Sequence, residues 1–241
     1  MLPQTARRPF DWLRTSKPPH SRNPLRGAAR MVTCRYNRDM ADRCYLSVWC
    51  QGMDGETLPG LFEKFLATAP FSSSSPGFSQ LVLRAMDWAE TPLIEEDWRE
   101  SPLEAAGVLA EIRENLTADS GCEVETQWEL WTFDPATSAW TLSPQKLELA
   151  CFGLEFDEGF CSENGHFRAE LGFEHLFTGD ANLEEQSEAL AEIRENTRDN
   201  VRRLERWMGQ ISRSLPVARM RLWSENEENL EGRLDAILAP N

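Results

Sequence analysis

The chain has 241 residues, of which 41% are hydrophobic and 27% charged, and its formal net charge at pH 7 is −15. This length and composition are sufficient for a hydrophobic core without disulfides, and the negative charge argues against binding to nucleic acid or to anionic membranes. No stretch approaches the roughly 18 consecutive apolar residues that a membrane-spanning helix requires.

The charge changes sign near residue 40. Residues 1–39 carry nine Lys or Arg and two acidic residues, a net charge of +7, whereas residues 40–241 have a net charge of −22. The first segment contains five prolines and shows no helical or strand periodicity, so it is predicted to be a disordered basic leader. Residues 40–241 are predicted to form a single acidic domain with a short C-terminal tail. Met40 directly precedes the first strand pattern and is therefore a candidate for the natural start.

The cysteines indicate the cellular compartment. None of the six forms a CxxC pair, and the leader lacks the apolar stretch of a secretory signal. Reduced thiols without such a signal are typical of cytosolic proteins, so the protein is predicted to be cytoplasmic.

The first half of the domain alternates strand and helix patterns. Residues 43–50 alternate in polarity and are rich in β-formers, which predicts a strand. Apolar residues at helical spacing over 58–69 predict an amphipathic helix that ends at Pro70, and a second strand is expected at about 78–86. An acidic connection over 87–100 leads to a second helix, whose start is marked by the sequence Ser101-Pro102-Leu103-Glu104.

Residues 122–133 show the clearest alternation in the chain. Val124, Trp128 and Leu130 fall on one side and several glutamates on the other, which predicts a half-buried antiparallel strand. Further strands are expected at 146–152 and 166–175.

Apolar residues at three- and four-residue steps then predict one long helix over about 183–215, ended by Pro216. A last strand is expected at 217–223. Together these elements predict an α+β fold, in which a mainly antiparallel sheet of about five or six strands is packed by two shorter helices and the long helix.

The residues with the most potential chemistry lie between 157 and 175. On the strand expected there, His166, Arg168 and Glu170 share the polar face, and Asp157 or Glu163 could add a carboxylate. Such a row could bind an anion or transfer protons. The favoured interpretation is a solvated strand face with cross-strand ion pairs. The Cys and His spacings match no zinc pattern and no nucleotide-binding motif occurs, so neither a metal nor a cofactor is predicted.

A second candidate surface combines tryptophan with glutamate. Trp131 falls on the same side of its strand as Glu123, Glu125 and Glu129, and Trp49 points away from the core set of the first strand. Exposed aromatics among acids would suit a docking surface, because Trp is a frequent anchor in protein interfaces. The competing interpretation is that the long helix covers this face and that both Trp side chains belong to the core.

The sequence therefore favours a non-enzymatic, cytosolic protein-interaction module with an acidic Trp-bearing surface, immunity- or inhibitor-like at most. The expected partner is a basic protein, and a homodimer through the helix at 183–215 is a further option. No nucleic acid or membrane partner is expected. The alternative is a small-molecule enzyme or binder that uses the strand face around 157–175.

Overall fold

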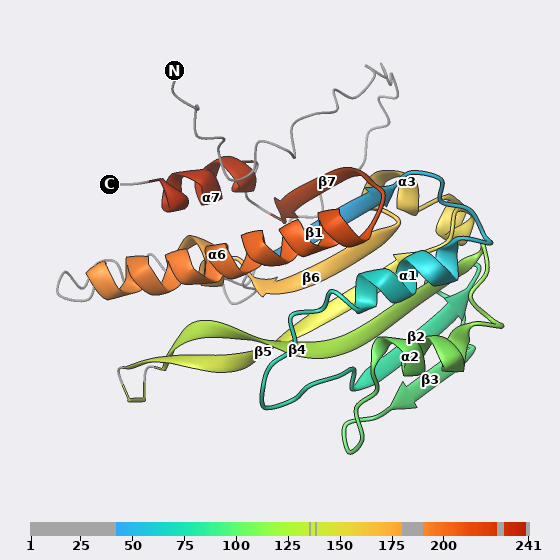
Figure 1. Ribbon diagram of the computed structural model, residues 1–241, viewed down its shortest axis with the longest axis horizontal. Coiled ribbons are helices and arrows are strands. Elements are labelled where there is room, and N and C mark those ends of the chain that lie inside the picture. The colour runs from blue at the N-terminus through green and yellow to red at the C-terminus, as the bar shows by residue number, and fades with distance from the viewer. Residues whose placement is uncertain (1–41, 135, 138, 180–189, 226–228, 240–241) are drawn as a thin grey trace, which may run out of the picture.

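The fold is α+β and is built on a single seven-stranded sheet (Figure 1). The computed structural model describes residues 42–134, 136–137, 139–179, 190–225 and 229–239, so the predicted basic leader lies outside the described residues. The strand order is β3-β2-β4-β5-β6-β1-β7, and every neighbouring pair is antiparallel. The strands are β1 (Arg43–Cys50), β2 (Gln80–Ala85), β3 (Ile94–Asp97), β4 (Ser120–Asp134), β5 (Ala139–Phe152), β6 (Phe167–Phe173) and β7 (Val217–Ser224).

The sheet has more strands than the five or six that the sequence predicts. The unexpected strand is β3, which lies within the connection predicted at 87–100 and pairs only with β2. Its sequence Ile-Glu-Glu-Asp has no apolar alternation, and its three acidic residues are exposed. A short, charged edge strand of this kind lacks the pattern that marks a half-buried strand, but its charges protect the sheet edge against unwanted pairing.

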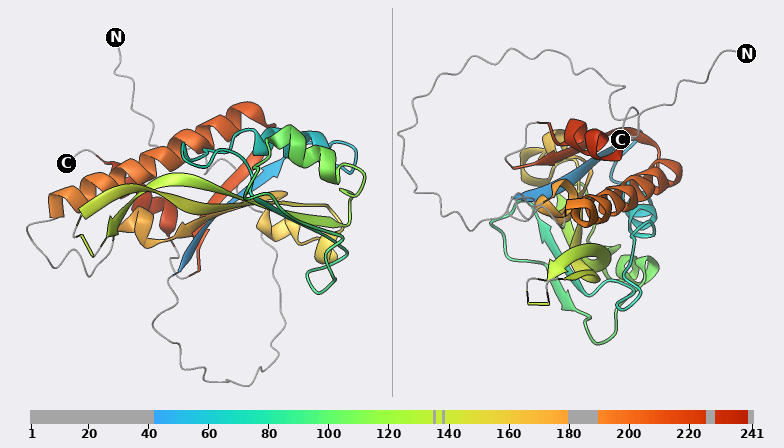
Figure 2. Two further views of the ribbon diagram at one scale, coloured as in Figure 1. Left: turned by 90° about the horizontal axis from the view of Figure 1, so that it is seen from below. Right: turned by 90° about the vertical axis from the view of Figure 1, so that its left-hand side faces the viewer.

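Helices cover one face of the sheet much more completely than the other. In Figure 2 (left), α1 (Leu58–Leu66), α2 (Ala105–Ile112) and α6 (Leu190–Ser214) lie on one side, and the one-turn helix α3 (Cys161–Asn164) lies on the other. The remaining helices are the 3₁₀ turn η2 (Phe156–Glu158), α4 (His175–Thr178) and α7 (Leu230–Leu238). Helix α6 is the predicted long helix, although residues 183–189 of that prediction lie outside the described residues. No helix among the described residues is long and apolar enough to cross a membrane.

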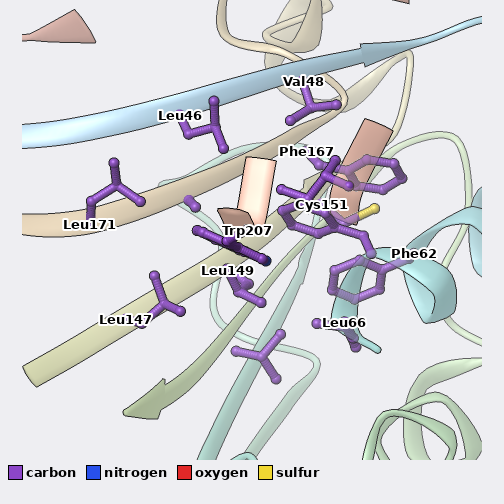
Figure 3. Close-up of a cluster of buried hydrophobic side chains, with 14 of the residues drawn as sticks. Leu46, Val48, Phe62, Leu66, Leu147, Leu149, Cys151, Phe167, Leu171 and Trp207 are labelled. Atoms are coloured by element: carbon purple, nitrogen blue, oxygen red, sulfur yellow. The ribbon is translucent and has the colours of Figure 1, made fainter. Parts of the chain in front are cut away.

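The main core lies between the sheet and the helices α1, α2 and α6. Figure 3 shows side chains from β1, β5 and β6 meeting those of α1 and α6: Leu46, Val48, Phe62, Leu66, Leu147, Leu149, Cys151, Phe167, Leu171 and Trp207. All of them are almost fully buried. Since full burial of a Leu or Phe side chain contributes roughly 1.5–3 kcal/mol, this face provides most of the stability.

Helix α6 also closes the free edge of β4. Strand β2 pairs with β4 only as far as Glu125, so the later residues of β4 have no strand on that side. The Asn200 side chain takes the place of a strand there. Its Oδ1 accepts a hydrogen bond from the backbone N–H of Trp131 (2.8 Å), and its Nδ2 donates to the backbone carbonyl oxygens of Trp131 and Leu176 (2.9 Å each). Asn200 is buried, so this one side chain satisfies backbone groups that water cannot reach.

The opposite face of the sheet carries the polar side chains that the alternation predicts. Its charged residues pair across strands, as Arg84 does with Glu123 and Lys146 with Glu125 and Glu148. One end of this face is covered by a second apolar cluster that includes Phe152, Phe156 and Cys161. The candidate functional residues lie on and around this face.

Candidate functional site

His166 has a structural position at the start of β6. Its Nδ1 accepts a hydrogen bond from the Cys50 N–H (3.0 Å), and its carbonyl oxygen accepts one from the Phe152 N–H (2.9 Å). Burial lowers the pKa of the imidazole. Because Nδ1 must keep its lone pair to accept the Cys50 hydrogen bond, the neutral ring is the form that fits this position. His166 therefore joins the ends of β1, β5 and β6.

Arg168 and Glu170 share the polar face as the sequence predicts, but each is engaged by a different partner. The Arg168 guanidinium lies 5.2–5.7 Å from the ring centroids of Tyr45, Phe152 and Phe160, and it lies 3.9 Å from the Glu123 carboxylate. Glu170 pairs with Arg43. The structure thus places His166, Arg168 and Glu170 on neighbouring strand positions without linking them into one reactive group.

The three glutamates predicted for the interaction surface also form ion pairs or hydrogen bonds within the protein. Glu123 lies between Arg84 and Arg168, and its pKa is raised, first by burial and then by the nearby Glu148 carboxylate. Glu125 pairs with Lys146 at 2.8 Å. Glu129 accepts hydrogen bonds from the Ser73 hydroxyl (2.6 Å) and backbone (3.1 Å), which hold its pKa below the ordinary value.

The two tryptophans predicted as anchors, Trp49 and Trp131, are half-buried, and the indole N–H of each donates a hydrogen bond within the protein. The Trp49 indole N–H lies 3.1 Å from the Cys161 carbonyl oxygen and 3.2 Å from that of Ser162, and the Arg219 guanidinium stacks on the Trp49 ring at 4.1 Å. The Trp131 indole donates to Asp199 of α6 at 3.0 Å. Both side chains therefore connect elements of the fold: Trp131 contacts the long helix, whereas Trp49 contacts α3 and β7.

Asp157 and Glu163 belong to η2 and α3, the segments whose apolar residues cover one end of this face. Asp157 belongs to η2, and its N–H donates to the carbonyl oxygen of Met86 at 2.7 Å. Met86, Asp157 and Glu158 have φ angles of 71°, 46° and 56°, and they are the only non-glycine residues with positive φ in the described part of the chain. Such backbone costs about 1–3 kcal/mol per residue and persists only where neighbouring structure holds it.

Two glycines allow the loops at this end to approach one another. A Cβ atom at Gly153 would lie 2.2 Å from the carbonyl oxygen of Ala118, and one at Gly121 would lie 2.5 Å from the Phe156 ring. The Glu155 N–H donates to Ala118 O at 2.7 Å, and the Met86 N–H donates to Asp119 O at 2.8 Å. The connections that follow β2, α2 and β5 are therefore tied together at one end of the sheet, on the right in Figure 1, near α3.

Large apolar side chains are exposed at this end. Met86 is 62% exposed, Leu93 57% and Leu154 40%, and these are the three most exposed large hydrophobic residues in the described chain. We call Met86, Leu93 and Leu154 the apolar patch. Trp88, between the first two, instead packs edge-on against the rings of Phe152, Phe156 and Phe160 and so fixes the β2–β3 connection in place.

Acidic residues surround the apolar patch in the chain. Residues 87–104 contain seven acidic residues and a single arginine, and residues 154–163 contain four acidic residues and no basic one. The members of this set are Asp87, Glu90, Glu95, Glu96, Asp97, Glu100, Glu104, Glu155, Asp157, Glu158 and Glu163. Those on or beside the connections that carry the apolar patch are Asp87, Glu90, Glu95, Glu155, Asp157 and Glu158, and with the apolar patch we call them the acidic end. Asp97 instead pairs with Gln80 at the far end of β2, and Glu100 and Glu104 follow it there. Sequence reasoning identified its charge but not its exposed apolar residues, because Met86 and Leu93 resemble ordinary core positions next to a strand.

Two cavities lie elsewhere, along α6. One of about 340 Å³ lies between α4, α6 and α7, and the other, of about 280 Å³, lies between α6, β4 and the segment that follows α1. Neither is lined by His166, Arg168 or Glu170. Within the described residues, no group of three or more His, Cys, Asp or Glu side chains is arranged to hold a metal ion.

Comparison with known proteins finds no relative of this chain. The chain matches no protein-family model, and neither a curated protein nor a solved structure resembles it significantly.

Proposed function

We propose that the protein is a non-enzymatic interaction module that binds a basic protein through the acidic end. The observation that carries this proposal is that the exposed Met86, Leu93 and Leu154 lie on the same two connections as several carboxylates and no basic residue. Exposed apolar residues with a polar rim are typical of protein interfaces. The acidic rim favours a partner of positive charge and would speed its association. An immunity- or inhibitor-like role in the cytoplasm is one form of this proposal.

The backbone at the acidic end supports a preformed surface. The loops that carry Met86 and Leu154 are joined by hydrogen bonds through residues 118 and 119, and Trp88 anchors the β2–β3 connection on three aromatic rings. A surface that is already ordered loses less conformational freedom on binding, which leaves more of the contact energy for affinity. Positive φ angles at the same place are consistent with a conformation kept for a purpose other than stability.

The two other options from the sequence receive less support from the geometry. An enzyme that uses His166, Arg168 and Glu170 would need these groups to act on a common substrate, whereas each is occupied by its own partner. A homodimer through α6 would need an exposed apolar stripe. The stripe residues of α6, among them Val201, Leu204, Met208 and Ile211, are instead buried against the chain's own sheet.

The test compares two matched surfaces in partner capture from a lysate of the source organism. One variant carries Met86→Ser and Leu93→Ser at the acidic end, and the control carries Leu142→Ser on the β4–β5 hairpin, where the side chain is also exposed. We expect a basic protein to be retained by the wild type and by the control. The double variant should lose it, because removing two apolar contacts typically weakens an interface by about tenfold or more.

A charge variant separates electrostatic attraction from apolar contact. Glu90→Gln with Glu95→Gln should mainly slow association and reduce its dependence on salt, since both residues are exposed. Equal retention of one partner by the wild type and the Met86→Ser, Leu93→Ser variant would refute the proposed surface. A copurified metabolite without a protein partner would instead favour the small-molecule alternative.

A further inference from the structure

The carboxylates of the acidic end are not compensated within the described part of the chain. No ion pair there involves any of the six: Asp87, Glu90, Glu95, Glu155, Asp157 and Glu158. On the polar face of the sheet, by contrast, Glu123 pairs with Arg84 and Glu125 pairs with Lys146. The three residues of the apolar patch are exposed beside the uncompensated carboxylates. This surface therefore fits a segment that is basic and partly apolar.

The same chain contains a segment of complementary composition. Residues 1–39 carry nine Lys or Arg and two acidic residues, and their only Phe and Trp lie within residues 7–14, Arg-Arg-Pro-Phe-Asp-Trp-Leu-Arg. In this stretch, which we call the leader segment, three apolar residues stand between arginines. Trp and Arg are the residues that most often carry the binding energy of protein interfaces. The leader segment thus combines an apolar centre with basic flanks, whereas the acidic end combines an apolar centre with acidic flanks.

The place where the leader joins the fold sets the distance that it must span. Asp42 precedes the first residue of β1, and Cys50 is the last residue of that strand. Cys50 lies at the end of the sheet near the acidic end, because His166 accepts hydrogen bonds from both the Cys50 N–H and the Phe152 N–H. Strands β6, β5 and β4 lie between β1 and β2. The length of β1 and four strand spacings therefore separate Asp42 from Met86, a distance of about 30 Å.

The length of the leader suits this distance. Arg14 precedes Asp42 by 28 residues in the sequence. A chain of that length without regular structure has a root-mean-square end-to-end distance of about 26–32 Å. An attachment whose length matches the span gives the tethered segment an effective concentration of about the millimolar range. The leader segment of the same chain is therefore favoured over that of a second copy at ordinary protein concentrations.

We infer that the leader segment occupies the acidic end of its own chain when no partner is bound. Phe10 and Trp12 lie on the apolar patch in this arrangement, and the arginines on either side pair with the surrounding carboxylates. The inference rests on the proposed function, because both use the same surface. It adds that a basic partner must displace the leader segment, so the apparent affinity for the partner falls with the fraction of molecules whose surface is free.

The test measures this contact in the purified full chain without any partner. Ser16→Cys in a Cys34→Ser background carries a nitroxide spin label next to the leader segment, since the other five cysteines are buried. The label broadens the NMR signals of backbone amides that lie near it. In dilute buffer we expect loss of the amide signals of the apolar patch and unchanged signals at Leu142 of the β4–β5 hairpin. At about 1 M salt the lost signals should return, because the screening length falls to about 3 Å.

Matched variants of the leader locate the contact. Phe10→Ser with Trp12→Ser should restore the signals of the apolar patch, because it removes the aromatic side chains of the leader segment. Leu25→Ser with Met31→Ser removes two apolar residues elsewhere in the leader and should leave the loss of signal unchanged. Thermal unfolding of both variants should match that of the labelled protein, which excludes misfolding.

A mixture of spin-labelled protein and unlabelled, isotope-enriched protein distinguishes contact within one chain from contact between two copies. We expect the isotope-enriched protein to keep its signals. Equal loss of signal in the mixture would assign the contact to a second copy and overturn the inference. Retained signals in the labelled chain itself, or an equal loss in the Phe10→Ser, Trp12→Ser variant, would overturn it as well.

The outcome is distinguishable from that of the lysate capture that tests the proposed function. Loss of the apolar-patch signals without any captured basic protein would contradict the proposed function alone. A captured basic protein together with retained signals would contradict this inference alone.

Discussion

His166 illustrates how one side chain can serve structure where its chemistry suggested catalysis. Its ring accepts the Cys50 N–H and its backbone accepts the Phe152 N–H, so it fixes three strand ends at once. Burial keeps the pKa of the ring below its ordinary value. The folded protein therefore binds the His166 proton less readily than the unfolded chain does.

This difference predicts a pH dependence of stability. Because the folded-state pKa is the lower one, the contribution of His166 is complete above the unfolded value of about 6.5 and is lost as the pH falls through the folded value. His166→Asn keeps a hydrogen-bond acceptor but cannot titrate. In urea unfolding between pH 8 and pH 5, we expect the stability advantage of the wild type over this variant to shrink as the pH falls. An advantage that stays constant or grows as the pH falls would contradict the lowered pKa assigned to His166 in the folded protein.

At the scale of elements, the contact between β4 and α6 depends on Asn200. Replacing it with alanine leaves buried backbone groups of Trp131 and Leu176 without partners. We expect Asn200→Ala to lower the free energy of unfolding by about 2–4 kcal/mol. Asn200→Asp should also destabilise, because a carboxylate cannot donate to the two carbonyl oxygens. Arg202→Ala, two residues further along α6 and exposed, should change stability by less than about 0.5 kcal/mol. An effect as small as this for Asn200→Ala would contradict the prediction.

The strands β4 and β5 also bury thiols. Cys122 and Cys151 face each other in register and are inaccessible to solvent. Burial raises the pKa of Cys50 to about 11 and raises the pKa of Cys122 and of Cys151 well above the ordinary range. Since the thiolate is the reactive form, these cysteines should be inert in the folded state.

A thiol-reactivity measurement checks this point. In a Cys34→Ser variant, the five remaining cysteines are all buried and free. We expect none of them to react with Ellman's reagent at pH 8 during a period in which the urea-unfolded protein reacts completely. Fast stoichiometric reaction of one thiol in the native protein would show that its environment is more open than described.

The elements show which features the sequence can reveal. Alternation identified β4, and the three- and four-residue steps identified α6, because burial on one face imposes these periods directly. Strand β1 was identified as well, although all its residues from Cys44 to Val48 are buried and both of its faces are therefore covered. Strand β3 escaped because both its charge and its edge position remove that signal. Trp131 was placed with Glu129 on an exposed face, yet it contacts α6, because β4 forms the sheet edge beyond Glu125 and α6 runs along that edge. The apolar patch depends on how three loops meet, which no local pattern records.

At the scale of the whole molecule, charge is distributed unevenly along the fold. The acidic end is dominated by carboxylates, whereas residues 190–224, which form α6 and β7, contain eight arginines and four acidic residues. A polarised molecule of this kind orients a charged partner before contact. The proposed interface uses the acidic end and not the arginine-rich elements α6 and β7.

The measurement that tests the central claim most directly is position-specific photocrosslinking in a lysate of the source organism. A benzoylphenylalanine residue replaces Leu93 at the acidic end in one protein and Leu142 on the β4–β5 hairpin in the other, since both side chains are exposed. We expect one defined adduct with a basic protein from position 93, weakened by added salt, and no such adduct from position 142. No adduct at position 93, or the same adduct from both positions, would contradict the account.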